Sequence, residues 1–496
     1  MIPFIYKLRD EVHIVNQADS YLVVSDLPLN AVRMSGAAVR ILESCDGMRT
    51  LAGIAQRAGS AKEEEIFKVC EYFRERGFLE QEPAPSGGLQ PSVSVIIPVK
   101  NRCEELVECL ESVFAQDYPH DRMEVIVIDD GSTDETFDAA NRFPVKLFTN
   151  PVSRGQSFCR NLGAREACGE ILAFLDSDCV AEPTWLRELT AYFSWERVGA
   201  VGGYVDGYFG ASVLDRYEQA ASPLNMGKRH QVGNHDSSTL YVPTCNLLVR
   251  KIIFLEAGGF QPELHVGEDV DFCWRMRNRG HLLVYAPRGA VRHKHRNSLR
   301  GMLSRRCDYG TSEALLYRLH SDKKKRFNVP PLAGLSCLTA VAGILSLSAW
   351  VLLLSLIPLL LDIAKKELKL RQARLGPPIA RVAFSVIRGH CSMGYFFSFH
   401  LIRYYLVLLI PLGLLVPSAW LLSLVALLLA SAVDYTTRRP RLPYPIYVMY
   451  YTLEHLAYQL GVAIGCLRSR KFGSYIPVLT IRRPNRPLLG EPPQGA

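Results

Sequence analysis

The sequence has no patterned cysteine spacing. Its 13 cysteines are scattered singly along 496 residues, and no two of them form a CxxC pair. Small disulfide-stapled domains and structural zinc sites both rely on paired cysteines, so both classes are excluded. We expect reduced thiols in a reducing compartment, used mostly as small apolar residues.

The chain also has little excess charge, and its beginning contains no uninterrupted apolar run. Lys7, Arg9, Asp10 and Glu11 break up the first residues, so we expect no secretory signal peptide. The net charge is +8, and the basic excess lies mostly beside apolar segments after residue 330. This placement indicates anionic lipid headgroups as partners and argues against nucleic acid.

Residues 1–82 predict a small separate domain. Apolar periodicity places strands at 12–15, 21–24 and 78–79, and helices at 36–42, 50–58 and 61–76. Ser35 is expected to cap the first helix, and Gly77 to end the third. Such an order is typical of a winged helix, and the Pro- and Gly-rich stretch that follows predicts a linker over 83–91.

The pattern LPLNAVRMSGAAVRILESCDG, followed by a short helix and FLE, resembles PqqD-like domains. This resemblance implies binding of a peptide precursor during peptide modification. A winged helix used only for packing is the alternative.

A second unit begins at Ser92 and alternates strands with helices. The apolar run 93–98 predicts a strand that is covered on both faces. The other expected strands are 125–128, 145–148 and 171–175, and the expected helices are 103–115, 133–141 and 157–167. This order predicts parallel βαβ units, whose ligands bind at the carboxyl ends of the strands. Pro98, Asp129 and Asp176 all fall at such ends.

The stretch GEILAFLDSD, from Gly169 to Asp178, ends an apolar strand in two carboxylates. Burial of paired carboxyl groups would raise the pKa of each, a close like charge would raise one of them further, and a divalent cation would relieve this conflict. The pair therefore predicts Mg²⁺ or Mn²⁺ holding a phosphorylated substrate. A solvated turn is the alternative.

Five motifs in order carry a more specific resemblance. SVIIPVKN, IDDGSTD, RGQSFCRNLG, FLDSD and VGEDVDFCWRM, between residues 92 and 316, resemble the inverting family-2 glycosyltransferases of the GT-A fold. The resemblance implies a nucleotide-sugar donor, a UDP-sugar, and a divalent metal, Mn²⁺ or Mg²⁺. The donor contacts that it implies are Pro98, Val99, Lys100, Asp129, Asp130, Arg160, Asn161, Asp176 and Asn246. Helix capping is the alternative role for Arg160 and Asn161.

The same resemblance implies the metal ligands and the catalytic carboxylate. Asp176 and Asp178 are expected to bind the metal together with a histidine, for which His293 and His295 are both candidates. A surface histidine pair is the alternative. In the Glu268–Asp269 pair, Asp269 is expected to remove the proton from the acceptor hydroxyl. A helix predicted over 270–278 makes a capping role for Asp269 the alternative.

The tail contains two long uncharged runs, 327–361 and 404–433. Each run is long enough for one membrane helix and too short for two straight spans. Prolines interrupt both runs, and basic clusters lie on both sides of them, so re-entrant hairpins or in-plane helices are an alternative to a single span. A buried soluble helical domain is a further alternative. We expect residues 321–496 to be a membrane-associated helical region at the cytoplasmic face of the cell membrane.

The combination of a PqqD-like start, a family-2 core over 92–320 and HRNSLRGMLSRRCDYGTSEALLYRLH resembles the mycofactocin-system glycosyltransferases. This resemblance implies transfer of glucose, extended into a short β-1,4-linked glucan, to a peptide-derived redox cofactor. One alternative is a membrane transferase for lipid-linked or cell-surface polysaccharide, although the QxxRW motif of processive synthases is absent. Another is a peptide-recognition scaffold with an inactive transferase half.

Overall fold

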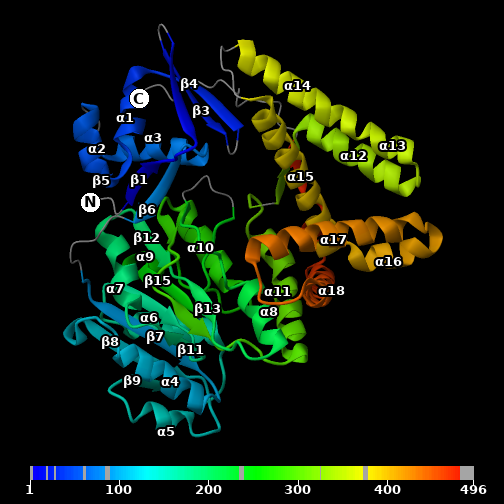
Figure 1. Cartoon of the computed structure of the whole chain (residues 1–496). Coiled ribbons are helices and arrows are strands. Elements are labelled where there is room, and N and C mark those ends of the chain that lie inside the picture. Colours follow the sequence, from blue (N-terminus) through cyan, green and yellow to red (C-terminus); the bar gives the residue numbers. More distant parts are fainter. Residues whose placement is uncertain are drawn as a thin grey trace. The chain divides into compact units, whose positions relative to one another are not determined.

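The computed structural model describes residues 4–17, 20–26, 29–59, 63–83, 90–233, 239–323, 325–372 and 378–480, so most of the predicted linker lies outside the described residues. The chain forms two compact units, each assembled from distant segments (Figure 1). One unit contains Met1–Pro85, Lys325–Asp434 and Pro477–Ala496. The other contains Ser86–Lys324 and Tyr435–Ile476.

The second unit is built on an eight-stranded sheet. In spatial order its strands are β14 (Gln231–Gly233), β16 (Leu282–Tyr285), β12 (Val198–Gly202), β15 (Asn246–Arg250), β10 (Ile171–Leu175), β7 (Val93–Val99), β8 (Met123–Asp129) and β9 (Lys146–Thr149). The predicted parallel arrangement is confirmed for β10, β7, β8 and β9. The whole sheet is mixed, because β15 runs antiparallel to both β10 and β12.

Helices cover this sheet closely. They include α4 (Cys103–Phe114), α5 (Thr136–Ala140), α6 (Gln156–Glu166), α7 (Trp185–Thr190), α9 (Lys251–Glu256) and α10 (Glu268–Asn278). At Gly163 of α6, a Cβ atom would lie 2.6 Å from Ile96 Cγ2, so only glycine allows this approach of helix to sheet. The Phe174 ring of β10 packs against Phe254 in a tilted arrangement and against Phe260 edge-on, both at centroid distances of 5.1 Å, which fixes the α9 region over the strand.

A small sheet with the order β11–β17–β13 lies beside the large one and is formed by Cys179–Ala181, Val291–His293 and Val205–Gly207. The longest helices of the unit are α11 (Leu299–Leu319) and α18 (Tyr444–Ser469), with α8 (Val213–Ala221) beside them. Arg306 of α11 is buried and reaches Glu218 of α8 at 2.7 Å and Glu454 of α18 at 3.4 Å. These charges tie α18 into the same unit as the large sheet.

The first unit begins with two three-stranded sheets. One contains β5, β1 and β6 (Asp46–Thr50, Phe4–Leu8 and Leu79–Pro83), and the other β2, β3 and β4 (Val12–Gln17, Ser20–Asp26 and Leu29–Met34). The helices are α1 (Gly36–Ser44), α2 (Leu51–Ala58) and α3 (Glu63–Glu75). Ser35 caps α1 as predicted. The sequence missed β1 and β5, whose pairing partners lie far along the chain, and it also missed β4, which pairs with the neighbouring β3.

The same unit contains the apolar helices of the tail. They are α12 (Pro331–Leu345), α13 (Ala349–Leu354), α14 (Leu356–Gln372), α15 (Ile379–Tyr404), α16 (Leu406–Leu415) and α17 (Ser418–Arg438). Leu22, Val24 and Ala31 of the β2–β4 sheet share a buried cluster with Leu370, Val382 and Val386 of α14 and α15. Two short strands, β18 (Arg326–Asn328) and β19 (Val478–Thr480), pair in parallel.

Within the described residues, one helix, Ser418–Arg438, is long and apolar enough to cross a membrane. The pair α15 and α16 passes the same test together but is bent by 88°. The first uncharged run, 327–361, does not form a single helix, because the chain turns after Leu345 and again after Leu354. Ser336 Oγ donates to Ser355 O at 2.9 Å, so this run folds back on itself, and its relation to a membrane stays a prediction.

Candidate active site

Polar residues from several strands meet at one edge of the large sheet. Val99 ends β7 and pairs with Asp129 at the end of β8, and Asp130 N donates to Val99 O at 2.8 Å. Asn246 begins β15, but β15 is antiparallel to β10, so Asn246 pairs with Leu175, the residue before Asp176. Because β15 runs in the opposite direction, its first residue lies at the end of the sheet where the parallel strands finish.

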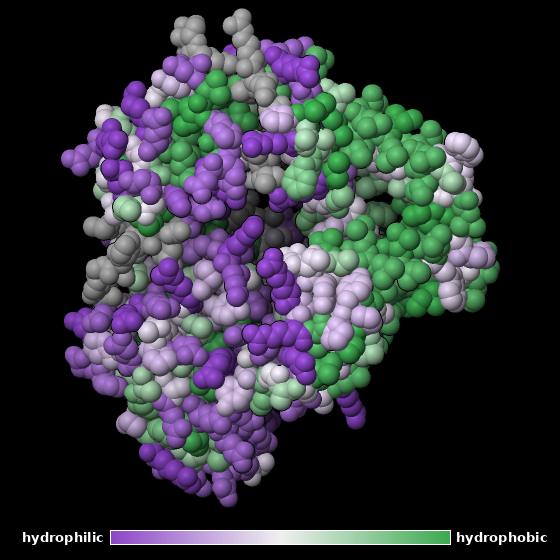
Figure 2. Space-filling model, in the orientation of Figure 1, coloured by the Kyte–Doolittle hydropathy of each residue, from purple (hydrophilic) through white to green (hydrophobic). Residues whose placement is uncertain are grey.

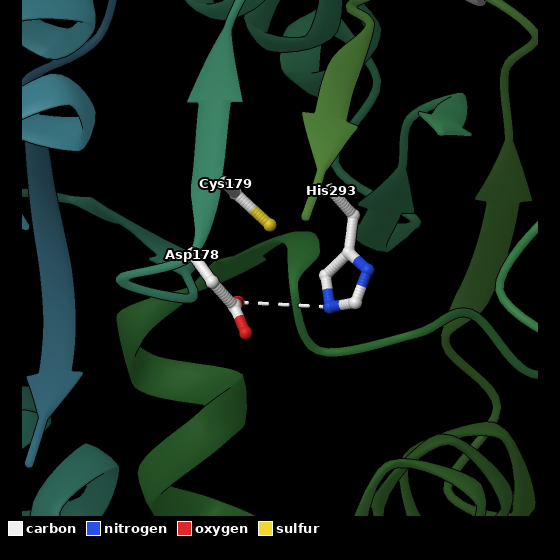
Figure 3. A group of neighbouring side chains, drawn as sticks. All are labelled: Asp178, Cys179 and His293. Atoms are coloured by element: carbon white, nitrogen blue, oxygen red, sulfur yellow. Dashed lines mark ion pairs between the residues drawn. The ribbon is translucent and has the colours of Figure 1, made fainter. Parts of the chain in front are cut away.

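Asp178 lies next to His293 (Figure 3). The pairing of Cys179 with His293 across β11 and β17 brings them together, with Nε2 of His293 3.6 Å from Oδ1 of Asp178. Burial alone would raise the pKa of Asp178, but His293 and an ion pair with Arg102 lower it. Cys179 lies in the same group, but burial raises the pKa of its thiol, so it remains protonated at neutral pH.

His295 has a different partner. Its Nε2 lies 3.1 Å from Oδ1 of Asp215, at the start of α8, and both side chains are buried. Burial lowers the pKa of His295, although Asp215 partly opposes this effect. The two histidines that the sequence could not separate therefore have separate environments, and His293 is the one beside Asp178.

Arg160 connects the two carboxylate motifs. Its guanidinium, 1% exposed, donates to Asp176 at 2.5 Å and to Glu268 at 2.9 Å. Thr244 Oγ1 also lies 3.3 Å from the same oxygen of Glu268. Arg160 therefore links the end of β10 to the start of α10 and neutralises a carboxylate at each.

Asp269 lies in the first turn of α10, and the N-cap position belongs to Gly267, whose φ is 84°. Its Oδ1 accepts a hydrogen bond of 2.8 Å from the Val270 N–H. Burial and the adjacent charge of Glu268 raise the pKa of Asp269 to about 7. A carboxylate with such a pKa can accept a proton at neutral pH, as a general base must.

Residues 94–255, which contain the β7, β8 and β10 ends and Asn246, match the family model described as glycosyl transferase family 2. This segment of the chain is therefore a family-2 glycosyltransferase sequence. The matched segment stops before Glu268 and Asp269, so the geometry of α10 extends the site beyond it.

Curated relatives agree with this membership. The chain is 34% identical over 244 residues to the pre-mycofactocin glycosyltransferase of Mycobacterium tuberculosis, a match that covers 48% of this chain and 50% of that protein. It is 34% identical over 203 residues to glycosyltransferase AglE of Haloferax volcanii, covering 40% of this chain and 64% of that one. The chain thus spans about half to two-thirds of the length of these relatives.

Solved structures of low identity were also matched. The mannosyltransferase PcManGT of Pyrobaculum calidifontis, in complex with GDP-Man and Mn²⁺, is 20% identical, with a TM-score of 0.39 and coverage of 61% of this chain and 87% of that chain.

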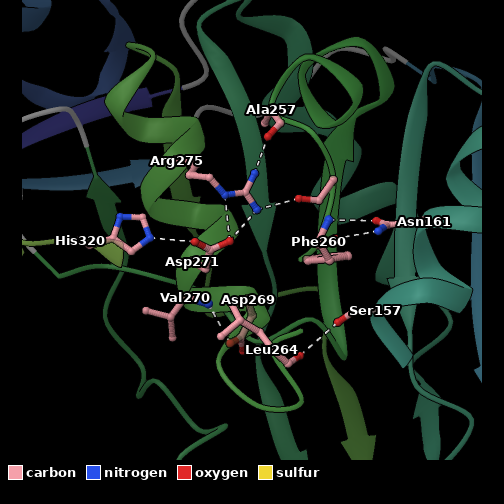
Figure 4. Close-up of polar contacts among 11 residues, drawn as sticks. Ser157, Asn161, Ala257, Phe260, Leu264, Asp269, Val270, Asp271, Arg275 and His320 are labelled. Atoms are coloured by element: carbon pink, nitrogen blue, oxygen red, sulfur yellow. Dashed lines mark hydrogen bonds and ion pairs between the residues drawn. The ribbon is translucent and has the colours of Figure 1, made fainter. Parts of the chain in front are cut away.

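A network around Asp271 holds the loop of the transferase that leads to Asp269 (Figure 4). Asp271 is fully buried and accepts from Arg275 at 2.6 Å, and Nε2 of His320 lies 2.8 Å from its other oxygen. Arg275 also donates to the backbone oxygens of Gly259, at 2.6 Å, and Ala257. Burial alone would raise the pKa of Asp271, but these partners lower it.

Asn161 holds the same loop from the other side. Its Nδ2 donates to Phe260 O at 2.7 Å and its Oδ1 accepts from Phe260 N at 2.9 Å. A Cβ atom on Gly259 would lie 2.5 Å from that Oδ1, and the φ of 65° at this residue also favours glycine. Asn161 thus fixes the position of the loop, and its contact with the donor stays a prediction.

Two more of the expected donor residues are bonded within the protein. Asp130 accepts from Asn150, Ser153 and the backbone N–H groups of Arg154 and Gly155, and these bonds outweigh burial and lower its pKa to about 2. The Asn246 amide donates to the Tyr204 and Gly289 oxygens and accepts from Trp185 Nε1. Both side chains therefore bind protein groups that surround the carboxyl ends of the parallel strands.

The other expected donor residues differ in their exposure. Lys100 is exposed, just after β7, and Asp129 accepts from the Ser132 N–H at 3.0 Å. Pro98 and Val99 belong to β7, and both are buried. Their roles in binding the base and ribose remain predictions.

The sequence motifs do not identify Asn101 and Arg102 as residues of this site. Asn101, at a φ of 50°, accepts from the Thr133 N–H at 2.8 Å and joins the turns after β7 and β8. Arg102 pairs with Asp178. Arg305 lies 4.9 Å from the centre of the Tyr309 ring, one helical turn further on. Burial would lower the pKa of Arg305, but Tyr309 and the carboxylates of Glu268 and Asp176 raise it.

The candidate metal ligands of this site fit a hard divalent cation. Oδ1 of Asp178 and Nε2 of His293 lie 3.6 Å apart, and Asp176 directly follows β10. Arg102 pairs with Asp178 and Arg160 pairs with Asp176, so each of the two aspartates has a positively charged group beside it. The protonated thiol of Cys179 is a poor ligand for Mn²⁺ or Mg²⁺, which favour oxygen and imidazole donors.

Proposed function

We propose that this chain is an inverting glycosyltransferase of the GT-A fold, which transfers glucose from UDP-glucose to a peptide-derived redox cofactor of the mycofactocin type. Extension of the product into a short β-1,4-linked glucan belongs to the same proposal. The observation that carries it is Asp269, whose pKa of about 7 suits a base and which follows Glu268, the carboxylate that Arg160 joins to Asp176. The similarity to the pre-mycofactocin glycosyltransferase supports the acceptor class.

The reaction follows from these positions. The Asp269 carboxylate takes the proton of the acceptor hydroxyl, whose oxygen attacks the anomeric carbon from the face opposite the nucleotide. The bond between that carbon and the diphosphate oxygen breaks, and UDP leaves with the electron pair. Asp176, Asp178 and His293 would hold Mn²⁺ or Mg²⁺, with His295 as the remaining candidate. The bound metal would supply positive charge to the diphosphate.

The remaining parts of the chain have proposed roles as well. The PqqD-like segment, residues 1–82, would recruit the peptide-derived acceptor. Residues 321–496 would attach the protein to the cytoplasmic face of the cell membrane, which the exposed apolar side chains of α12–α17 support. These side chains also favour the second candidate function, a membrane transferase for lipid-linked or cell-surface polysaccharide.

One assay separates these candidates. Full-length protein in detergent is given UDP-glucose and Mn²⁺ with either a mycofactocin-type peptide acceptor or a polyprenyl phosphate, and UDP release and product mass are measured. We expect glucose on the peptide acceptor, and loss of the product in excess chelator. Glucose on the polyprenyl phosphate alone would favour the second candidate.

Two other results would contradict the proposal. Absence of UDP release with either acceptor would leave a peptide-recognition scaffold. Undiminished transfer in excess chelator would remove the metal from Asp176 and Asp178.

A further inference from the structure

The tail helices expose a large apolar surface (Figure 2). Among its most exposed side chains are Leu338, Leu347, Trp350, Leu408, Leu414 and Leu415. Trp350 and Leu415 are 81% and 82% exposed, and a large contiguous apolar patch marks a protein or membrane interaction site. The opposite faces of α14 and α15 are buried against the β2–β4 sheet. The apolar surface is therefore one side of a packed unit.

We propose that this surface enters a single leaflet of an anionic membrane as two adjacent hairpins, α12/α13 and α16/α17, without crossing the bilayer. This inference rests on the membrane attachment proposed above and specifies how it is made.

The lengths of the helices favour this arrangement. α12 has 15 residues and α16 has 10, which is about 22 Å and 15 Å of helix, against a hydrocarbon core of about 30 Å. α17 has 21 residues, but its uncharged part ends before Asp434, after about 24 Å. Tyr395 donates to Asp434 at 2.7 Å, so this charged end is fixed on the protein side of the apolar surface.

The two turns lie together. Ser418 Oγ, at the start of α17, donates to the backbone oxygen of Leu345, at the end of α12, at 2.7 Å. Trp420 of α17 packs against Gly413 of α16, where a side chain would collide with the indole. Both hairpins therefore turn close together, and Leu347, Trp350 and Leu415, at or beside these turns, are all strongly exposed. A hairpin that crossed a bilayer would place this uncharged turn among the headgroups of the far leaflet.

Basic residues occur at the other ends of these helices. Arg326 precedes α12, Lys365 and Lys369 lie in the charged half of α14, and Arg403 and Arg438 lie in the last turns of α15 and α17. Such residues interact favourably with anionic headgroups at the near surface. This charge pattern favours a lipid leaflet as the occupant over a second copy of the chain, which would present the same positive charges.

The test introduces one new cysteine at a time into the full chain, in which the exposed Cys168 and Cys391 and the partly exposed Cys103, Cys307 and Cys337 are changed to serine. Leu347→Cys and Leu415→Cys report on the turns, and Lys365→Cys, at an exposed position of the basic half of α14, is the control. Each variant is added to vesicles of phosphatidylcholine and phosphatidylglycerol and treated with a membrane-impermeant maleimide before and after permeabilisation. We expect labelling of Lys365→Cys throughout, and loss of labelling at both turns in both conditions.

Other outcomes overturn the inference in distinguishable ways. Labelling of the turns only after permeabilisation would show crossing of the bilayer and leave membrane attachment intact. Failure of the protein to float with the vesicles would refute attachment itself. Protection of the turns without vesicles would show that a second copy covers them.

Discussion

At the residue scale, the pKa of Asp269 is the central property of the site. Burial is the largest cause of its rise to about 7, and the charge of Glu268 is the next. The proton-accepting form of Asp269 is the carboxylate, so we expect kcat/KM to fall as the pH falls through about 7.

The Glu268→Gln substitution tests this account. It removes the neighbouring negative charge and leaves the positive charge of Arg160 less compensated, and both changes lower the pKa of Asp269. The acidic limb of the pH profile of kcat/KM should therefore move to lower pH. Glu263→Gln, at an exposed position of the preceding loop, is the matched control and should leave the limb in place. An unmoved limb in the Glu268→Gln variant would contradict the coupling.

Single residues were partly predictable. Asp176, Asp178 and Asp269 follow from motifs, because carboxylates directly after apolar strands or at helix starts are visible in the sequence. The partners of these residues were not predictable. Arg102 reaches Asp178 across 76 positions, and Arg160 reaches Glu268 across 108, so only the fold brings them together. The separation of His293 from His295 likewise depends on Asp215.

At the scale of elements, the contact between α11 and α18 supports the site. A Cβ atom on Gly461 of α18 would lie 1.9 Å from the Cys307 oxygen, and one on Gly310 of α11 would lie 2.3 Å from the Tyr458 oxygen. The backbones of the two helices therefore touch, as in other helix pairs with small residues at the interface. α11 carries Arg305 and Tyr309, which lie near the carboxylates of the site.

We expect Gly461→Ala to lower the free energy of unfolding by about 1–3 kcal/mol, because the new methyl group overpacks this contact. The matched control is Gly389→Ala in α15, where nothing lies within 4 Å of a Cβ atom. That change should instead be neutral or slightly stabilising, since alanine is the better helix former. Thermal unfolding of both variants in the same detergent measures the difference. Equal midpoints would show that α18 can shift away without cost.

The sequence located most helices and strands of the core but not every direction. The apolar pattern of Leu247–Val249 is the same for a parallel and an antiparallel strand, and the path of the chain before β15 decides between them. The tail shows a similar limit. The length of an uncharged run limits the length of a possible membrane helix. The helix breaks after Leu345 and Leu354, however, depend on packing among α12, α13 and α14.

At the scale of the whole molecule, the sequence suggests consecutive domains, 1–82, 92–320 and 321–496. The two compact units are each discontinuous, with residues 435–476 in the unit of the large sheet, and the domain boundaries stay a prediction. Composition cannot reveal this, because α18 is apolar like the rest of the tail. Polar residues of α18 contact the rest of this unit: Glu454 contacts both Arg306 and Tyr217, and Tyr458 donates to Glu313. Only the fold shows these contacts.

The most direct test of inverting transfer with Asp269 as the base is the anomeric configuration of the product. Full-length protein is supplied with UDP-glucose, in which glucose is α-linked, and the glycosidic linkage of the product is determined by proton NMR. Direct displacement predicts a β-linkage, and the Asp269→Asn variant should form the same product roughly 10²–10⁴ times more slowly with unchanged donor affinity. An α-linked product, or near-normal turnover of the Asp269→Asn variant, would contradict the account.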